Sequence, residues 1–374
     1  MRFATKTIHA GQEPEPTTGA VTPPIYMTST YSQREQSELT YARGQNPTRA
    51  RLQENLAALE DAKHALAFSS GMGAITTALT LLKKGDHVIV TDDCYGGVYR
   101  IFTRFMSAYG IESTFMDLRD LVDVEDSFRP ETRMLWMESP TNPLMKVADL
   151  RELAVITKAH DALSVCDNTF ASPALQNPLK LGVDLVVHSM TKYLGGHADV
   201  LGGALVMNRE DLFDRLRFAQ NALGAVPSPF DAWLILRGIK TLSVRMEKHC
   251  DNAERLAAFL KAHSAVAKVH YPGLPDDPGH AVAKKQMRRF GGMLSFEVQD
   301  PKGLMDRLKR LEVIILAESL GGVESLIEVP ATMTHKSVPV EQQKKQGITE
   351  GLVRFSVGIE DAEDLIDDIR RALS

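Results

Sequence analysis

The chain has 374 residues, of which 44% are hydrophobic and 24% charged, and a length of this kind predicts two or three domains. Its 43 basic and 48 acidic residues give a formal charge of −5, which argues against nucleic acid or an anionic membrane as a partner. The N-terminal sequence lacks the apolar stretch of a signal peptide, and no apolar run approaches the ~20 residues that span a bilayer. We therefore expect a cytoplasmic protein. Three distant cysteines without a C-x-x-C pair argue against a disulfide framework or a zinc ribbon.

Residues 1–43 are predicted to form an extended arm. Four prolines, at positions 14, 16, 23 and 24, and several clusters of Thr and Ser interrupt any helical period. An arm with so little core of its own has to lie on another surface.

Residues 44–236 are predicted to form an α/β domain. An amphipathic helix from Pro47 to Lys63 is followed by short apolar runs that alternate with helical segments. Runs of this kind are typical of strands buried on both faces, so we expect one mainly parallel, doubly wound sheet. The expected strands cover residues 65–68, 87–90, 134–137, 163–166, 185–187 and 204–207.

Residues 237–374 are predicted to form a smaller α+β domain. A long helical stretch from Leu236 to His263 leads into a turn-rich segment and then into the strand candidate GGMLSFEV. The final segment, LVRFSVGIEDAEDLIDDIRRAL, predicts a strand and a helix with an acidic N-terminus.

Polar residues directly follow several of the expected strands. In open parallel sheets, ligands bind beyond the carboxyl ends of the strands, so these residues should share one rim. The segments concerned are Ser69–Gly73, which opens a helix, Glu138–Asn142, Asp167–Thr169 and Ser189–Lys192.

This set of residue types predicts a pyridoxal phosphate site. The cofactor aldehyde needs a lysine for a Schiff base, for which Lys192 is the candidate, and its ring nitrogen needs a carboxylate, for which Asp167 is the candidate. Main-chain N–H groups at a helix start and nearby hydroxyls suit a phosphate. The candidates for these phosphate contacts are Gly71, Met72, Ser189 and Thr191, and Thr169 is a further candidate for binding the cofactor. Singly, each residue has a plainer interpretation as a surface or turn residue, and their joint placement favours the site.

Three further residues suit the surroundings of such a ring. Tyr95, followed by two glycines, is expected to stack on the ring face. Arg43, at the end of the arm, is expected to clamp a phosphate if the arm reaches a ligand site. Arg354 lies inside the apolar run LVRFSV, where a charge must be paired or face a cavity, and an amino-acid carboxylate is a fitting partner.

Competing motifs are weaker. Gly71-x-Gly73 after a strand, with Asp92 or Asp93 further on, resembles a dinucleotide fingerprint, but Thr76 occupies its third small-residue position. An NAD(P)-dependent oxidoreductase and a non-catalytic scaffold remain as alternatives from other classes. No metal is expected, because His188 and His197 beside Lys192 have no third ligand in view.

The sequence resembles the pyridoxal phosphate enzymes of cysteine and methionine metabolism over essentially its whole length. The strings that carry the resemblance are YARGQNPTR, SSGMGA, DDCYGGVYR, ESPTNPL, VCDNTFASPALQNPL, HSMTKYLGGHADV, LAESLGGVESLIEVPATMTH and LVRFSVGIEDAEDL. The resemblance implies an aspartate-aminotransferase-like fold and a homotetramer built from dimers, with active sites shared between subunits. It also implies the cofactor roles given above for Lys192, Asp167 and Tyr95.

The resemblance adds residues from the arm and for the substrate. Tyr41 and Arg43 match phosphate ligands donated by the neighbouring subunit. The positions that match substrate contacts are Asn142, Glu318, Ser319 and Arg354, with Arg354 on the α-carboxylate and Glu318 toward the distal amino-acid end.

Within the family the sequence is most similar to cystathionine γ-lyases, with cystathionine γ-synthases close behind. The implied reaction is γ-elimination on cystathionine, and the alternative is γ-replacement of an O-acylhomoserine by cysteine. Methionine γ-lyases are set aside because they carry a cysteine at the position of Gly97, and bacterial β-lyases because they lack the string Glu318–Gly322. Thr40 stands where γ-lyases and γ-synthases often have an acidic residue.

Overall fold

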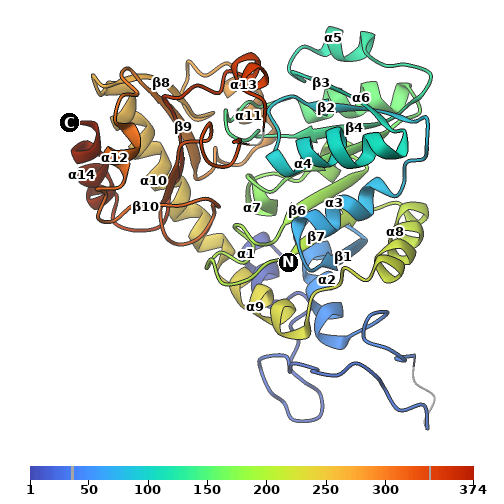
Figure 1. The fold of residues 1–374 in the computed structure, drawn as a ribbon. Coiled ribbons are helices and arrows are strands. Elements are labelled where there is room, and N and C mark those ends of the chain that lie inside the picture. The colour runs from blue at the N-terminus through green and yellow to red at the C-terminus, as the bar shows by residue number, and fades with distance from the viewer. Residues whose placement is uncertain (35–37, 337) are drawn as a thin grey trace.

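The computed structural model describes residues 1–34, 38–336 and 338–374, and it shows two sheets with separate cores (Figure 1). The larger sheet has the strand order β1-β7-β6-β5-β4-β2-β3. Its strands are β1 (His64–Phe68), β2 (His87–Thr91), β3 (Glu112–Met116), β4 (Thr132–Glu138), β5 (Leu163–Asp167), β6 (Leu185–Ser189) and β7 (Gly203–Met207). The pairs from β6 to β3 are parallel, and β7 runs antiparallel to both of its neighbours. The predicted mainly parallel, doubly wound sheet is confirmed.

Both faces of the larger sheet are buried under helices. On β4, Met134 and Trp136 pack into one core with α3 and α8, whereas Leu135 and Met137 pack into another with α6. This alternation explains why the central strands are apolar throughout. The helices in this part of the chain are α2 (Pro47–Leu59), α3 (Gly71–Leu79), α4 (Gly96–Arg100), α5 (Leu121–Asp126), α6 (Leu150–Ala159), α7 (Ser172–Leu175), α8 (Glu210–Leu223) and α9 (Pro229–Ile239). Single-turn segments follow at Ile101–Phe105, Met106–Tyr109 and Pro178–Leu181.

The smaller sheet has the strand order β10-β11-β12-β9-β8. Its strands are β8 (Val266–His270), β9 (Met293–Val298), β10 (Ile315–Leu316), β11 (Leu326–Glu328) and β12 (Leu352–Ser356). Phe296 and Phe355 of the central strands pack with Leu256 of α10 and Leu365 of α14 in one core. The helices here are α10 (Leu242–Ala262), α11 (His280–Gln286), α12 (Leu304–Leu308), α13 (Val340–Gln346) and α14 (Ala362–Leu373).

Local structure differs from the expectations in several places, and strands β8, β10 and β11 were also not expected. The helix expected from Leu236 to His263 is two helices, because α9 ends at Ile239 and α10 begins at Leu242. Strand β3 was not expected, since its sequence ESTFM is half polar and lies at the edge of the sheet, where only one side is paired.

The N-terminal arm is extended only in part. Residues Phe3–His9 form a helix, α1, that packs against α2 and α10 of the same chain, which corrects the extended interpretation there. Asn55 of α2 fixes its end by donating to Ala10 O at 2.8 Å. The following stretch runs away from the body of the molecule and returns to α2, as Figure 1 shows in blue.

Within the described part of the chain, no helix is both long and apolar enough to cross a membrane.

Candidate active site

A cavity of about 320 Å³ lies beyond the carboxyl ends of β4, β5 and β6 and beside the start of α3. The smaller domain closes it with residues around Glu318, Thr334 and Arg354. Twelve of the fourteen predicted site residues line this cavity: Gly71, Met72, Tyr95, Asn142, Asp167, Thr169, Ser189, Thr191, Lys192, Glu318, Ser319 and Arg354. The rim expected from the order of strand ends therefore exists, and the roles of its residues remain predictions.

The start of helix α3 forms one wall of the cavity. The Ser70 side chain caps the helix by accepting from Gly73 N at 3.0 Å. The preceding N–H groups, of Gly71 and Met72, have no acceptor among the described residues, as is usual for the first turn of a helix. A methyl group at Gly71 would lie 3.1 Å from Cβ of Ser189, so a larger residue here would have to push Ser189 back by a few tenths of an ångström. The wall thus offers free donors and hydroxyls, the chemistry that binds a phosphate.

Lys192 projects into the cavity from the turn after β6. Its Nζ donates to Oγ of Ser319 at 2.7 Å, which ties the larger domain to the smaller one at this amine. Burial, and then the positive charge of Arg354, lower the pKa of Lys192 to about 8. A substantial fraction of the amine is therefore neutral near pH 8, the form that reacts with an aldehyde.

Two buried carboxyl groups lie side by side at the ends of β4 and β5. Glu138 and Asp167 are paired in register, and both line the cavity. Burial raises the pKa of Asp167, although hydrogen bonds from Thr169 lower it in part. Burial and the negative charge of Asp167 raise the pKa of Glu138 well above its ordinary value. A cation beside Asp167 would stabilise the charged form of this carboxyl group and so offset the cost of burying the pair.

Tyr95 stands at the side of the cavity with its ring close to Gly97. Its main-chain N donates to Oε2 of Glu138 at 2.9 Å, which fixes the loop after β2 to the end of β4. A methyl group at Gly97 would lie 2.4 Å from Cε1 of Tyr95 and 2.8 Å from Sδ of Met72. The glycine therefore determines where the ring lies, and any side chain at this position would displace it.

Arg354 is almost completely buried, with 3% of its surface exposed. Its Nη1 donates to Oδ1 of Asn142 at 2.9 Å, and its Nη2 donates to the carbonyl of Ser319 at 2.8 Å. Oε1 of Glu328 lies 3.0 Å from the same Nη2. Glu328 and Thr334, which also lines the cavity, were not identified from the sequence.

Tyr41 and Arg43 do not line this cavity. The Arg43 guanidinium lies 5.5 Å from the centre of the Tyr41 ring, and its Nε donates to Asn221 at 3.3 Å. Tyr41 has 49% of its surface exposed. Their assignment to a neighbour's phosphate site remains a prediction.

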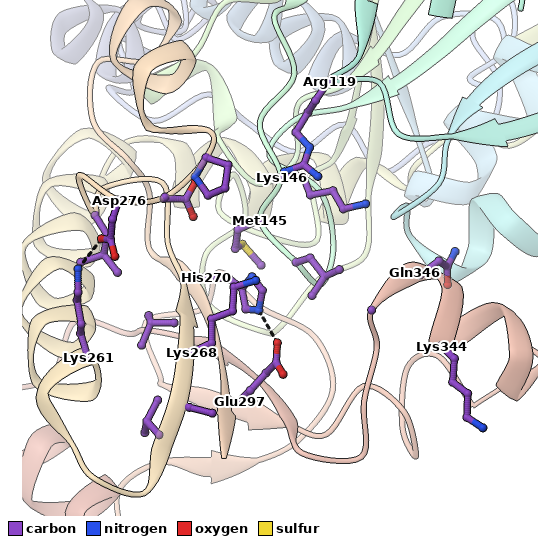
Figure 2. A pocket seen from close by; sticks show the side chains of 18 of the residues that line it. Arg119, Met145, Lys146, Lys261, Lys268, His270, Asp276, Glu297, Lys344 and Gln346 are labelled. Atoms are coloured by element: carbon purple, nitrogen blue, oxygen red, sulfur yellow. Dashed lines mark hydrogen bonds and ion pairs between the residues drawn. The ribbon is translucent and has the colours of Figure 1, made fainter. Parts of the chain in front are cut away.

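A larger cavity of about 600 Å³ lies between β8, α13 and the loop that carries Lys146 (Figure 2). Several of its charged side chains pair with each other, Lys261 with Asp276 and His270 with Glu297 at 3.0 Å. It contains none of the fourteen predicted residues. The smaller cavity is therefore the candidate active site.

The residues of the smaller cavity fit pyridoxal phosphate. Gly71 and Met72 have free N–H groups that suit a phosphate, Asp167 is a buried acid that suits a cationic partner, and Lys192 is an amine with a lowered pKa. Tyr95 supplies an aromatic face beside them. Each part of the cofactor has a matching group in this chain.

Comparison with known proteins identifies the family. The model of the Cys/Met metabolism PLP-dependent enzymes matches residues 4–374. The chain is 51% identical to a cystathionine β-lyase of Lactococcus lactis, covering 99% of this chain and 98% of the relative. It is 50% identical to a cystathionine γ-synthase of Mycobacterium leprae, covering 100% and 97%. The crystal structure of cystathionine γ-lyase from Lactobacillus plantarum complexed with L-serine has a TM-score of 0.97 and 45% identity, covering 100% and 98%.

The chain belongs to the pyridoxal phosphate-dependent enzymes of cysteine and methionine metabolism. The resemblance, the fold and the cofactor expected from the sequence are confirmed, and the dinucleotide oxidoreductase and the inert scaffold are no longer needed. One exclusion made from the sequence is not supported. β-Lyases were set aside on the string Glu318–Gly322, yet a relative named β-lyase is 51% identical over nearly the whole chain.

Proposed function

We propose that this enzyme catalyses γ-elimination on cystathionine, giving cysteine, 2-oxobutanoate and ammonia. The observation that carries the proposal is that Lys192, Arg354 and Glu318 line one cavity. Together they offer an amine for the reacting carbon, a cation for the α-carboxylate and an anion for the distal ammonium of a single substrate. Thr40 leaves Glu318 to supply the negative charge at the distal end.

The proposed roles follow from the contacts of each residue. Arg354 and Asn142 hold the α-carboxylate, Tyr95 stacks against the ring, and Asp167 keeps the ring nitrogen protonated. When bound, pyridoxal phosphate supplies an electron sink for negative charge at the substrate Cα. Lys192 Nζ removes the Cα proton and gives it up again to the substrate–cofactor system, which frees the amine to remove a proton from Cβ. The γ-sulfur then leaves with the electron pair of its bond to Cγ and takes a proton from the Lys192 ammonium, which gives cysteine.

Two related reactions use the same residues. In γ-replacement, cysteine adds at Cγ of an O-acylhomoserine after the acyl group leaves, and the relative from Mycobacterium leprae is named for this activity. In β-elimination on cystathionine the base acts only at Cα, and the thiol leaves from Cβ as homocysteine. The relative from Lactococcus lactis is named for that activity.

A product assay separates the three reactions. Cystathionine alone gives 2-oxobutanoate and cysteine by γ-elimination, and pyruvate and homocysteine by β-elimination. An O-acylhomoserine with cysteine gives cystathionine by γ-replacement. We expect 2-oxobutanoate to be the main oxoacid from cystathionine, and a predominance of pyruvate, or cystathionine synthesis much faster than its breakdown, would refute the proposal.

We also propose a cytoplasmic homotetramer whose active sites combine two chains. The three cysteines are free and buried, as expected for a reducing compartment. Tyr41 and Arg43 lie outside their own chain's cavity, which supports donation to a neighbour.

A further inference from the structure

The buried guanidinium of Arg354 has few donors to spare. Arginine has five N–H groups, two on each Nη and one on Nε. Nη1 donates one to Asn142 and Nη2 donates one to the Ser319 carbonyl at 2.8 Å, while Glu328 Oε1 lies 3.0 Å from Nη2 as its ion-pair partner. Nη2 therefore already faces two oxygen atoms.

A carboxylate that binds arginine with both oxygens needs two parallel N–H groups. The guanidinium offers such a pair on two edges, one made by Nη1 with Nη2 and the other by Nε with Nη2. Both edges include Nη2. A substrate carboxylate that binds in this way meets the Ser319 carbonyl and Glu328 Oε1 at Nη2, and the negative charge of Glu328 opposes its approach.

Glu328 is the more easily displaced of these two partners. Ser319 belongs to a loop held at two points, since its Oγ accepts from Lys192 Nζ and the nearby Gly321 N donates to Ser356 Oγ at 2.9 Å. Glu328 has a second partner, because Thr334 Oγ1 donates to its Oε1 at 2.8 Å. Its other oxygen has no partner among the described residues.

The strand register places Glu328 directly beside Arg354, so the folded sheet itself brings the two charges together. The two residues are direct partners across the antiparallel strands β11 and β12, and only 1% of Glu328 is exposed. Without an anion, a guanidinium buried this deeply is strongly disfavoured. Glu328 therefore stabilises the empty site and competes with the ligand for the same nitrogen.

We propose that Glu328 is the internal counter-ion that a substrate α-carboxylate displaces from Arg354, with Thr334 holding the released carboxylate, so that this pair sets the affinity for amino-acid substrates. The inference rests on the proposed binding of the α-carboxylate by Arg354. Glu328 is a positioning residue in this scheme, because it acts through Arg354.

The test measures the dissociation constant of glycine from the holoenzyme by calorimetry. Glu328→Gln keeps the size of the side chain and removes its charge, so we expect glycine to bind at least fivefold more tightly. Thr334→Val removes the alternative partner of Glu328, so we expect glycine to bind at least threefold more weakly. Opposite shifts from two neighbouring residues are not expected from general damage to the site.

Three controls make the result specific. Glu312→Gln changes an exposed glutamate that pairs with Arg371 and should leave glycine binding unchanged. Methylamine, which has no carboxylate, should bind the wild type and Glu328→Gln equally. Arg354→Lys should weaken glycine binding, and if it does not, the proposed carboxylate site itself fails.

Weaker or unchanged glycine binding in Glu328→Gln, together with a loss in Arg354→Lys, would overturn the role of Glu328 alone. If Glu328→Gln does not fold, Thr334→Val decides the question, since tighter or unchanged glycine binding there contradicts the inference.

Discussion

The Lys192 amine lies in the cavity, and its only hydrogen-bond partner among the described residues is the Ser319 hydroxyl. Its lowered pKa, about 8, predicts how the cofactor-free enzyme should react with pyridoxal phosphate. The neutral amine accumulates above this pKa, so the condensation rate should rise with pH and level off above about 8. Stopped-flow absorbance measures the rate, and borohydride reduction with peptide mapping should place the label on Lys192. A rate that keeps rising to pH 10, or label on another lysine, would contradict this prediction.

Asp167 should matter for rate more than for folding. Asp167→Asn removes the negative charge beside the ring nitrogen, and a neutral ring stabilises a carbanion less well. We expect kcat to fall at least tenfold, which corresponds to ~1.4 kcal/mol in the barrier. Asp161→Asn, in the exposed turn after α6, is the matched control and should retain normal rates. Near-normal turnover in Asp167→Asn would remove the residue from the mechanism.

Sequence reasoning located most site residues because polar residues at the ends of parallel strands converge by geometry. It missed Glu328 and Thr334, which come from the smaller domain and act through Arg354. The sequence did contain a signal for the pair of Glu328 and Arg354. The run SLIEVP carries one acidic residue among apolar ones, just as LVRFSV carries one basic residue, and two such strands bury opposite charges most readily as cross-strand partners.

At the scale of elements, the loops after β2 and β4 are joined by one buried acid. Oδ2 of Asp93 accepts from the Thr141 hydroxyl and from Leu144 N, the latter at 3.0 Å. Its Oδ1 has no partner among the described residues, and burial raises the pKa of Asp93 to about 6. These loops carry Tyr95 and Asn142, so the acid helps to hold the two sides of the site together.

Asp93 should make the stability of the protein depend on pH. Because its folded-state pKa lies above the ordinary value of 3.8, its contribution is fully present below pH 3.8 and is lost as the pH rises through 6. Asp93→Asn is neutral throughout, so its free energy of unfolding should fall less between pH 4 and pH 7, by about 2 kcal/mol. Urea unfolding at both pH values tests this against Asp161→Asn. Parallel pH profiles for Asp93→Asn and the wild type would refute it.

Helices and strands with a strong apolar pattern were predictable from the sequence. Those whose structure depends on their place in the fold, at a sheet edge or against other helices, were not. The six strands expected from apolar runs are all present. Strand β3 lacks such a run because it lies at the sheet edge, and α1 is short enough that its packing on α2 and α10 decides its structure. The sequence between α9 and α10 contains no proline, and its pattern does not predict that one helix ends and another begins there.

For the whole molecule, the position of the N-terminal arm leads to a prediction about how the subunits assemble. If Arg43 serves a neighbour's site, Arg43→Ala and Lys192→Ala proteins should each be nearly inactive, whereas hybrids made by refolding them together should regain activity. Some interfaces then pair an intact arm with an intact lysine site. Mass spectrometry confirms that hybrids have formed. Hybrids without activity would place Arg43 in its own subunit's site. Within its own chain Arg43 contacts Asn221 and the Tyr41 ring and lies outside the cavity.

Ser319 contacts both the reacting amine and the buried arginine of the site. Its hydroxyl holds the amine of Lys192, which comes from the larger domain, while its carbonyl holds Arg354 in the smaller sheet. Its φ of 86° lies in the left-handed region, where a residue other than glycine is kept only by its surroundings. Any displacement of Ser319 would therefore move its contacts with the lysine amine and with the guanidinium together, so a substitution at this one residue should disturb both.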